Sequence, residues 1–285
     1  MATRSVRIAR WAAGAVAGLA LLAAGIVYGV SEWRLRRSHE APLVPLRAAS
    51  APDLVAGEHM ARVVGCWSGC HGPRGEGGVD KVPGYRRVTA PTFSDVLAQY
   101  SDEELVRLIR FGVKRDGQSA FGMIPSTFWS LGDQDLANVI AHLRRQPPSE
   151  PLPRVRELTL RGRLALATGE MKVSADQVDR AAPRWGELSR TNAFERGRYL
   201  ASIVCSECHG RDFRGDPLEG GPSLVVIAAY SPEAFRGFMQ SGRPIGGRSI
   251  PNMDFLPDVG FTDREIADLY AFLRQYHGIE GEAGS

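Results

Sequence analysis

The segments Cys66-Trp67-Ser68-Gly69-Cys70-His71 and Cys205-Ser206-Glu207-Cys208-His209 contain all four cysteines of this 285-residue chain. In each, a close pair of cysteines ends directly at a histidine, with three residues between the cysteines in the first pair and two in the second. Cys-x-x-Cys-His is the pattern of covalent haem attachment, because each thiol can form a thioether to a haem vinyl group while the adjacent histidine binds the iron. The sequence therefore predicts two covalently bound haem c groups. Their predicted attachment residues are Cys66, Cys70, Cys205 and Cys208, and the predicted iron ligands are His71 and His209.

Other interpretations of the cysteines fit less well. A zinc site needs four converging ligands, whereas the two pairs lie about 140 residues apart. A thioredoxin-like redox motif requires a βαβ context, and no strand-like alternation flanks either pair. A disulfide framework requires many cysteines in a small chain.

Charge is concentrated at the N-terminus. Residues 1–37 hold six arginines and one glutamate, or +5, while the whole chain carries +3, so the remainder sums to −2. A near-neutral remainder offers no basic face for nucleic acid. The length allows about two domains.

Twenty uncharged, mostly apolar residues lie between Trp11 and Val30. As a helix they span about 30 Å, the thickness of a bilayer core, and predict an uncleaved N-terminal membrane anchor. Trp11 at one end and Tyr28 with Trp33 at the other are typical interfacial aromatics. A cleaved signal peptide is the alternative, but no small-x-small cleavage site closes the run.

A stripe of four glycines follows one face of this predicted helix, in two Gly-x-x-x-Gly pairs that allow close helix packing in lipid. A partner transmembrane helix on this stripe and an anchor without a partner are equally compatible with the pattern. The glycines are Gly14, Gly18, Gly25 and Gly29.

The remainder of the chain contains an internal repeat. Residues 101–146 align without a gap with residues 231–276 at a constant offset of 130, whereas the offset is about 139 at the cysteines. The second copy therefore has a shorter loop after its haem motif. The expected organisation is an anchor with flanks (1–37), a linker (38–52), a first domain (53–147), a second linker (148–192), a second domain (193–278) and a tail (279–285).

Each copy is expected to contain three helices. The first covers residues 53–64 or 193–204 and leads into the haem motif. The second begins at Ser101, with a capping pattern, or at Ser231 followed by proline. The third shows the 3.6-residue period at 136–143 and 266–273. Residues 158–166 also look helical within the second linker. No convincing strand is seen, so the expected fold class is all-α.

Met123 and Met253 occupy equivalent positions, each eight residues before the start of the last helix. This arrangement resembles class I cytochromes c, in which a methionine on a loop ahead of the C-terminal helix binds the iron. The resemblance covers residues 53–147 and 193–276. It implies two tandem class I cytochrome c domains, with Met123 and Met253 as the sixth iron ligands.

The resemblance also extends to a proline whose carbonyl accepts the Nδ1 proton of the iron-binding histidine. Pro222 matches this position in the second copy, within Gly-Pro-Ser-Leu. Pro91 is its counterpart in the first copy, with Pro83 as a rival.

The remaining histidines and methionines are expected to be ordinary packing or surface residues, because none occupies a repeated, ligand-like position. They are His39, His59, His142, His277, Met60, Met171 and Met239.

Histidine and methionine ligation would leave neither iron with an open position, which implies an electron carrier and not an enzyme. The chain also looks similar to the cytochrome subunits of membrane-bound periplasmic alcohol and sugar-acid dehydrogenases, notably over residues 104–117 and 123–148. Those subunits usually carry three haems and a C-terminal anchor, from which this chain departs.

The resemblance to c-type cytochromes implies haem domains in the bacterial periplasm, tethered to the inner membrane by a single N-terminal pass. The expected function is relay of single electrons between a respiratory donor, either a dehydrogenase or a quinol-oxidising complex, and a terminal oxidase or soluble cytochrome. Alternatives are a dihaem redox enzyme of the peroxidase or thiosulfate-oxidising type, and a subunit of a haem-copper oxidase.

Overall fold

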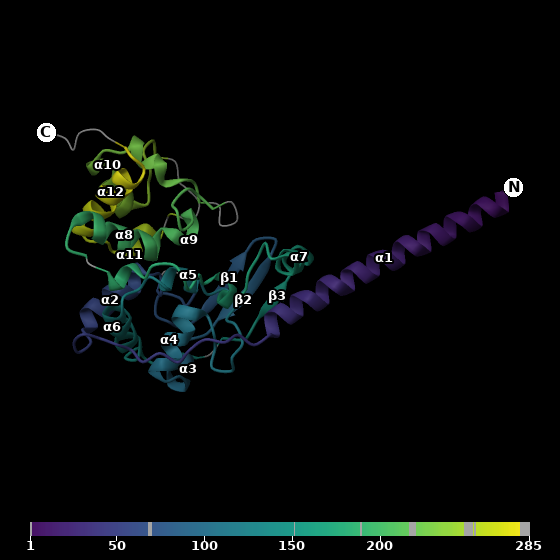
Figure 1. The fold of residues 1–285 in the computed structure, drawn as a ribbon, viewed down its shortest axis with the longest axis horizontal. Coiled ribbons are helices and arrows are strands. Elements are labelled where there is room, and N and C mark those ends of the chain that lie inside the picture. Colours follow the sequence, from purple (N-terminus) through teal and green to yellow (C-terminus); the bar gives the residue numbers. More distant parts are fainter. Residues whose placement is uncertain are drawn as a thin grey trace.

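A long helix and two helical units make up the structure. The computed structural model describes residues 2–67, 70–150, 152–188, 190–216, 221–247, 253 and 255–279. Helix α1 (Ala2–Arg36) projects from a body in which the two units lie side by side (Figure 1). Residues 280–285 of the expected tail lie outside the described residues.

The two units correspond to the two sequence repeats. The helices expected in each copy are α2, α4 and α6 in the first and α8, α10 and α12 in the second. The first unit holds α2 (Leu54–Val63), α3 (Phe93–Gln99), α4 (Asp102–Phe111), α5 (Pro125–Phe128) and α6 (Asp133–Leu143). The second holds α8 (Ala193–Val204), α9 (Ser206–His209), the 3₁₀ segment η3 (Leu224–Ala229), α10 (Pro232–Ser241), α11 (Leu256–Val259) and α12 (Asp263–Tyr276).

Local signals fix where several helices start. Ser101 caps α4 in a reciprocal capping box with Glu104, and Ser231 caps α10 with proline at the first helical position. Both helices end at a left-handed glycine, Gly112 or Gly242, with φ of 65° and 68°. The equivalent ends show that the repeat in sequence is also a repeat in structure.

A close helix crossing holds each repeat together. In the first, a Cβ added to Gly57 on α2 would lie 2.1 Å from the carbonyl oxygen of Asn138 on α6. In the second, a Cβ on Gly197 of α8 would lie 2.0 Å from the carbonyl oxygen of Asp268 on α12. Glycine is therefore required at both crossings, because any side chain would push the first helix off the last.

The expectation of an all-α fold is correct only in part, because the two repeats are helical but three short strands are also present. Strands β1 (Gly78–Val82) and β2 (Arg86–Ala90) form an antiparallel hairpin, and β3 (Arg156–Leu158) pairs antiparallel with β2. A turn at Pro83-Gly84 closes the hairpin, with Gly84 at φ +79° and Tyr85 N–H donating to the Val82 carbonyl over 3.0 Å. The hairpin occupies the longer loop of the first repeat.

Residues 148–192, expected to be a linker, are ordered against the first repeat. They contain β3, α7 (Leu160–Thr168) and the 3₁₀ segments η1 (Ser174–Gln177) and η2 (Trp185–Glu187). The ring N–H of Trp129 donates to Ala182 over 2.9 Å, and Gly186 N–H donates to Ser130 over 2.8 Å. The helix expected at 158–166 is α7.

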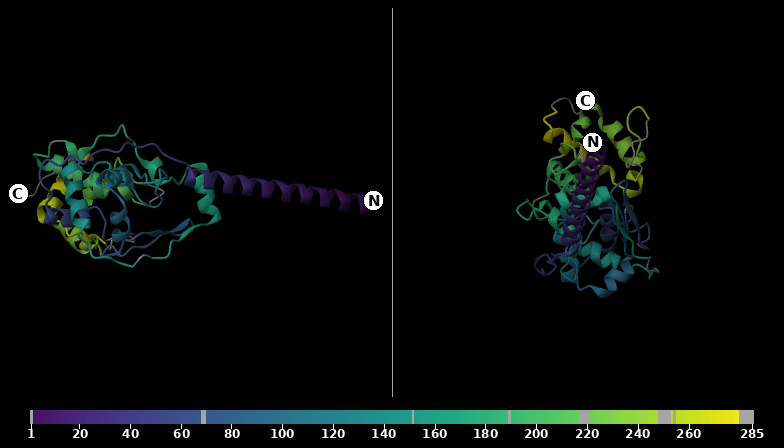
Figure 2. Two further views of the ribbon diagram at one scale, coloured as in Figure 1. Left: turned by 90° about the horizontal axis from the view of Figure 1, so that it is seen from below. Right: turned by 90° about the vertical axis from the view of Figure 1, so that its right-hand side faces the viewer.

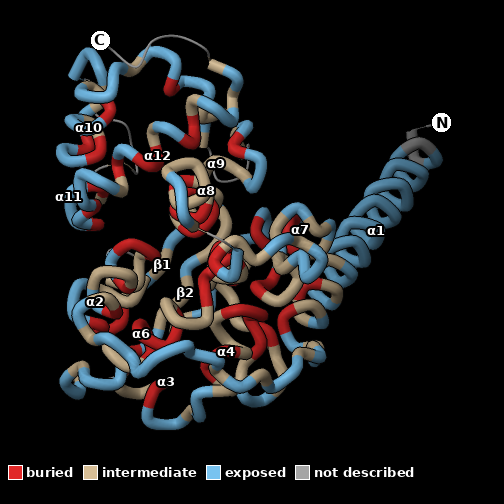
Figure 3. The backbone as a smooth tube through the Cα atoms, turned by 60° about the vertical axis from the view of Figure 1, so that its left-hand side comes forward, coloured by how far each residue is buried: buried red, intermediate tan, exposed pale blue. Residues whose placement is uncertain are grey.

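Among the described residues, α1 is the one helix long and apolar enough to cross a membrane. Its candidate span is Val6–Arg36, with a mean hydropathy of 2.0, and none of its most apolar window is buried in the protein. Figure 3 shows most of α1 exposed, whereas Ser31 and Leu35 near its end are buried against the body. Two views agree that its N-terminal part makes no contact with the body (Figure 2).

The glycine crossings can be tested by adding one methyl group. Gly57→Ala or Gly197→Ala should lower the free energy of unfolding by about 3 kcal/mol or more, because the new Cβ overlaps a carbonyl oxygen. Gly237→Ala in α10 is the matched control, since nothing lies within 4 Å of its added Cβ. It should be neutral or stabilise by about 0.5–1 kcal/mol. Equal effects of all three changes in denaturant unfolding would contradict the crossing as a constraint.

Candidate functional site

The two cysteine–histidine segments follow the first helix of each repeat. Cys66 N–H donates to Ala61 O over 2.8 Å, and Cys205 N–H donates to Ala201 O over 2.9 Å. The first bond joins residues five apart and closes the end of α2 after Gly65 (φ +75°), whereas the second joins residues four apart and continues the turn of α8 into the segment. All four cysteines are described, none forms a disulfide, and each is partly exposed.

Each histidine is oriented by a proline carbonyl. His71 Nδ1 lies 2.8 Å from Pro91 O, and His209 Nδ1 lies 2.7 Å from Pro222 O. Because a carbonyl can only accept, Nδ1 carries the proton in both rings and Nε2 keeps its lone pair. The geometry is that of an imidazole prepared to bind a metal through Nε2. Pro83 lies in the hairpin turn, so the rival position is not used.

The backbone around the two histidines is also equivalent. Gly77 N–H donates to His71 O over 2.8 Å, and Gly215 N–H donates to His209 O over 2.9 Å. The loop glycines Gly78 and Gly221 lie against the segment so closely that an added Cβ would meet Cys70 O at 2.5 Å or Cys208 O at 2.0 Å. The fold therefore builds the same local frame twice.

The first segment departs from the Cys-x-x-Cys-His pattern. Three residues separate Cys66 from Cys70, whereas two separate Cys205 from Cys208. Ser68 and Gly69, within the longer spacer, lie outside the described residues. The hydrogen bonds around the histidine are nevertheless the same in both repeats.

Burial shifts the ionisation of the cysteines and of one histidine. Burial raises the pKa of Cys66 and of Cys205 to about 12, so neither thiol is a thiolate at neutral pH. Burial lowers the pKa of His71, which favours the neutral ring that a metal ligand needs. No group of three or more His, Cys, Asp or Glu side chains suited to a metal ion occurs among the described residues.

The residues fit a haem in both repeats. Two cysteines and a neutral histidine with its Nε2 lone pair available are the donor set of covalent haem attachment. In the first repeat, the buried Trp67 Nε1 and Thr127 Oγ1 have no hydrogen-bond partner among the described residues. A polar group of a bound cofactor would satisfy them. The assignments of Cys66, Cys70, Cys205, Cys208, His71 and His209 stay predictions.

The two candidate methionine ligands are held differently. Ser174, fully buried on η1, donates from Oγ to Met123 O over 2.7 Å, and its N–H donates to Ala120 O over 3.1 Å. Met253 is partly buried against the core, and its carbonyl accepts from Leu256 N–H over 3.3 Å. The segment between the repeats therefore braces the Met123 loop, which no sequence pattern indicated. Both methionines remain predicted ligands.

The two repeats pack through reciprocal contacts. Helix α5, which follows Met123, contacts α8 and α9 of the second repeat, and α11, which follows Met253, contacts α2 of the first. Burial, with the carboxylates of Asp80 and of Glu207 from the other segment, raises the pKa of the Cys70 thiol to about 12. The two attachment segments are therefore electrostatic neighbours.

A pair of equivalent polar contacts closes the same interface. His59 Nε2 on α2 lies 2.8 Å from Glu265 Oε1 on α12, and the hydroxyl of Tyr199 on α8 donates to Asp135 Oδ2 on α6 over 2.6 Å. His59 aligns with Tyr199, and Asp135 with Glu265, in the sequence repeat. The repeats are thus related by approximate two-fold symmetry. His59, expected to be an ordinary packing or surface residue, therefore lies in the contact between the repeats.

His142, on α6, contacts Trp67 of the first attachment segment. Its ring lies edge-on to Trp67 with centroids 5.7 Å apart, and Gln146 Nε2 lies 3.0 Å from its Nε2. Phe93 stacks on His71 with centroids 4.6 Å apart. These contacts place His142 among packing residues and Phe93 against the predicted ligand.

Comparison with known proteins agrees with this geometry. Residues 192–273 match the family described as cytochrome C oxidase, cbb3-type, subunit III. The second repeat matches a cytochrome c domain. This match supports haem c and an electron-transfer role for that domain. The match covers less than half of the chain, and a search of curated proteins finds no match.

A search of solved structures finds a match to reduced recombinant cytochrome c4 from Pseudomonas stutzeri. It is 17% identical, and the alignment covers 79% of this chain and 98% of that one, with a TM-score of 0.24.

Removing the brace on Met123 should affect one site alone. Ser174→Ala leaves the Met123 carbonyl buried without its donor, at a cost of about 1–3 kcal/mol, and should weaken the iron–sulfur bond of the first repeat. Ser202→Ala is the matched control, because buried Ser202 also donates to a carbonyl, Tyr199 O, over 2.7 Å. Potentiometry should show one lowered midpoint potential in Ser174→Ala and none in Ser202→Ala. Two unchanged potentials in Ser174→Ala would refute the brace.

The His59–Glu265 contact should depend on pH. The hydrogen bond to Glu265 raises the pKa of His59, so the pair's contribution is fully present below the ordinary value of 6.5 and is lost as pH rises through the raised pKa. The imidazole is a third exposed, so the contribution is below about 1 kcal/mol.

Denaturant unfolding measures this effect as the stability difference between the native protein and His59→Gln. The difference should shrink as pH rises from about 5 to 8. Tyr199→Phe removes the symmetry-related contact, and burial raises the pKa of Tyr199 far above this range, so its cost should not vary. A His59→Gln difference that stays constant, or grows, with pH would rule out the charged pair.

Proposed function

We propose that this chain is a membrane-tethered dihaem cytochrome c that relays single electrons. Its donor would be a respiratory dehydrogenase or quinol-oxidising complex, and its acceptor a terminal oxidase or soluble cytochrome. Helix α1 would cross the bacterial inner membrane once, with both repeats in the periplasm. The observation that carries the proposal is the equivalent histidine–proline bond beside a cysteine pair in each repeat.

The protein's own residues would attach the two haems and set the environment of each iron. Cys66, Cys70, Cys205 and Cys208 would hold the two haems covalently. The Pro91 and Pro222 carbonyls would keep the histidine Nδ1 protons in place, so that each Nε2 faces the iron. Each haem, when bound, supplies an iron that takes up and gives back one electron. Met123 and Met253 would supply a soft sulfur that favours the reduced metal and leaves no position for a substrate.

The interface between the repeats supports a relay within one chain. Helix α5, next to Met123, contacts α9, which carries the second attachment segment. The charged side chain of Glu207 acts on Cys70 across the same interface. Bringing the two candidate sites together in this way shortens the route between them. The packed contacts at His59 and Tyr199 would keep that route fixed during electron transfer.

The proposal is tested by counting haems in variants of the full-length holoprotein. The native chain should carry two covalent haems and accept two electrons. Cys205→Ala with Cys208→Ala should leave one haem, in the first repeat, and Cys66→Ala with Cys70→Ala should leave one in the second. Loss of both haems in either pair, or two haems retained in either, would contradict independent attachment. Rapid cyanide binding by the native protein would instead favour the dihaem enzyme.

A second candidate is a subunit of a haem-copper oxidase, favoured by the match of residues 192–273 to the family described as cytochrome C oxidase, cbb3-type, subunit III. Purification in mild detergent distinguishes the two. A stable copper- and haem-containing oxidase that co-purifies in fixed proportion would favour the subunit. A chain that purifies alone and reduces an added soluble cytochrome would favour the carrier.

A further inference from the structure

Helix α7 is clamped to the end of α1. The guanidinium of Arg163 lies 4.1 Å from the Tyr28 ring centroid and donates to Ser31 Oγ and Glu32 Oε1, each over 3.0 Å. A small buried cluster of Leu35, Leu166 and Val173 packs beside these contacts. The end of α1 is therefore fixed to the body by apolar and polar contacts together.

This clamp determines how deep α7 lies. Tyr28 belongs to the apolar run from Trp11 to Val30, which crosses the bilayer under the proposed function. At a rise of about 1.5 Å per residue, a group that touches Tyr28 lies within one helical turn of the end of that run. Helix α7 is also the part of the body nearest to the projecting length of α1 in Figure 1 and in the left view of Figure 2. It therefore lies at the level of the lipid headgroups.

The outward face of α7 carries two exposed leucines beside the exposed Arg161 and Thr168. Leu160 and Leu164, one turn apart, are 73% and 49% exposed, whereas Gly162, Ala165 and Leu166 on the opposite face are buried. Gly162 packs against the β1–β2 hairpin, because a Cβ added to it would lie 2.1 Å from Tyr85 O. Two leucines facing outward at this level are suited to a hydrocarbon boundary and not to water.

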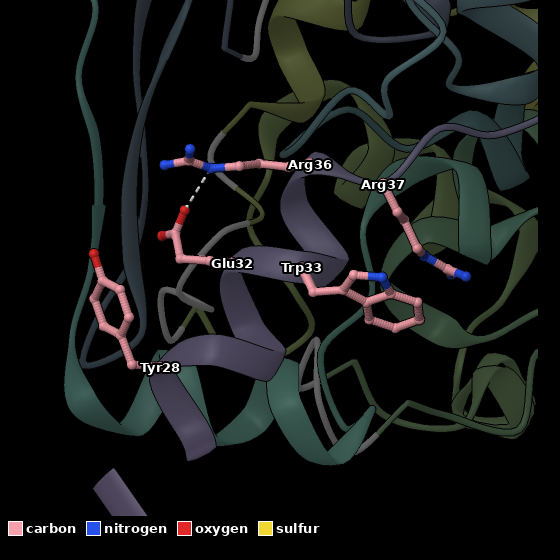
Figure 4. Close-up of a pocket in the computed structure, with 5 residues that line it drawn as sticks. All are labelled: Tyr28, Glu32, Trp33, Arg36 and Arg37. Atoms are coloured by element: carbon pink, nitrogen blue, oxygen red, sulfur yellow. Dashed lines mark hydrogen bonds and ion pairs between the residues drawn. The ribbon is translucent and has the colours of Figure 1, made fainter. Parts of the chain in front are cut away.

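Side chains typical of a membrane interface surround this face. On α1, Tyr28 and Trp33 are 54% and 60% exposed. They line a groove of about 410 Å³ together with Arg37, Glu32 and Arg36, and the last two are paired over 2.9 Å (Figure 4). On α7, exposed Arg161 lies over the Tyr85 ring at 4.4 Å. Arginines and aromatic rings at the rim of an apolar patch are the usual anchors at the headgroup level.

We propose that α7 is an interfacial helix that inserts Leu160 and Leu164 into the phospholipid bilayer crossed by α1. The inference rests on the membrane tether of the proposed function and adds a second point of contact with the lipid. One contact would let the repeats rotate about the anchor, whereas two fix the orientation of the first repeat relative to the membrane plane. The haem domains would then face their redox partners in one orientation.

Site-directed spin labelling of the full-length holoprotein tests this proposal. A single cysteine is introduced at Leu160 or Leu164, labelled, and reconstituted in vesicles of phosphatidylcholine and phosphatidylglycerol. Collisions with oxygen report lipid, and collisions with a water-soluble nickel chelate report water. Leu188→Cys is the matched control for Leu164, because its side chain is 47% exposed. Leu19→Cys reports the spanning part of α1.

The expected result is oxygen collisions in excess of nickel collisions at 160 and 164, with the reverse at 188. Nickel accessibility at 160 and 164 equal to that at 188, while the label at 19 is in lipid, would overturn the interfacial helix and leave the tether intact. A label at 19 that is accessible to nickel would overturn both.

Discussion

The close contact between the first and last helices of each repeat is the constraint on which the site depends. Gly57 and Gly197 bring two helix backbones into direct contact, which only a residue without a side chain allows. The first helix leads into the cysteine–histidine segment, and the last helix follows the methionine loop. The crossing therefore sets the two sides of the candidate site relative to each other. The same contact, made twice, gives two equivalent sites in one chain.

The two repeats contact each other through equivalent surfaces. The contacts of His59 with Glu265 and of Tyr199 with Asp135 occupy equivalent positions, as expected for two copies related by approximate two-fold symmetry. Symmetry alone does not require identical chemistry, since an ion pair in one half is matched by a neutral hydroxyl donor in the other. The segment between the repeats breaks the symmetry further, because it braces the first methionine loop and clamps α1.

Patterns among neighbouring residues predict many of the helices in this structure. Contacts between residues far apart in the sequence could not be predicted in this way. Helix starts such as Ser101 follow from capping, which involves neighbouring residues only. The hairpin was missed although Pro83-Gly84 is a turn pair, because its strands are short and mixed in charge. Pairing of β3 with β2, and the bond from Ser174 to Met123, join residues far apart in sequence. No periodicity or spacing encodes such contacts.

Ligation of each iron by histidine on one side and methionine sulfur on the other is the central claim. The most direct measurement is the ferric absorption spectrum of the native protein and of Met123→Ala, Met253→Ala and the double variant. A sulfur-to-iron charge-transfer band in the far red is expected in the native protein. Each single variant should lose its own share of that band, and the double variant should lose all of it. A band that is absent in the native protein, or unchanged in the double variant, would contradict the account.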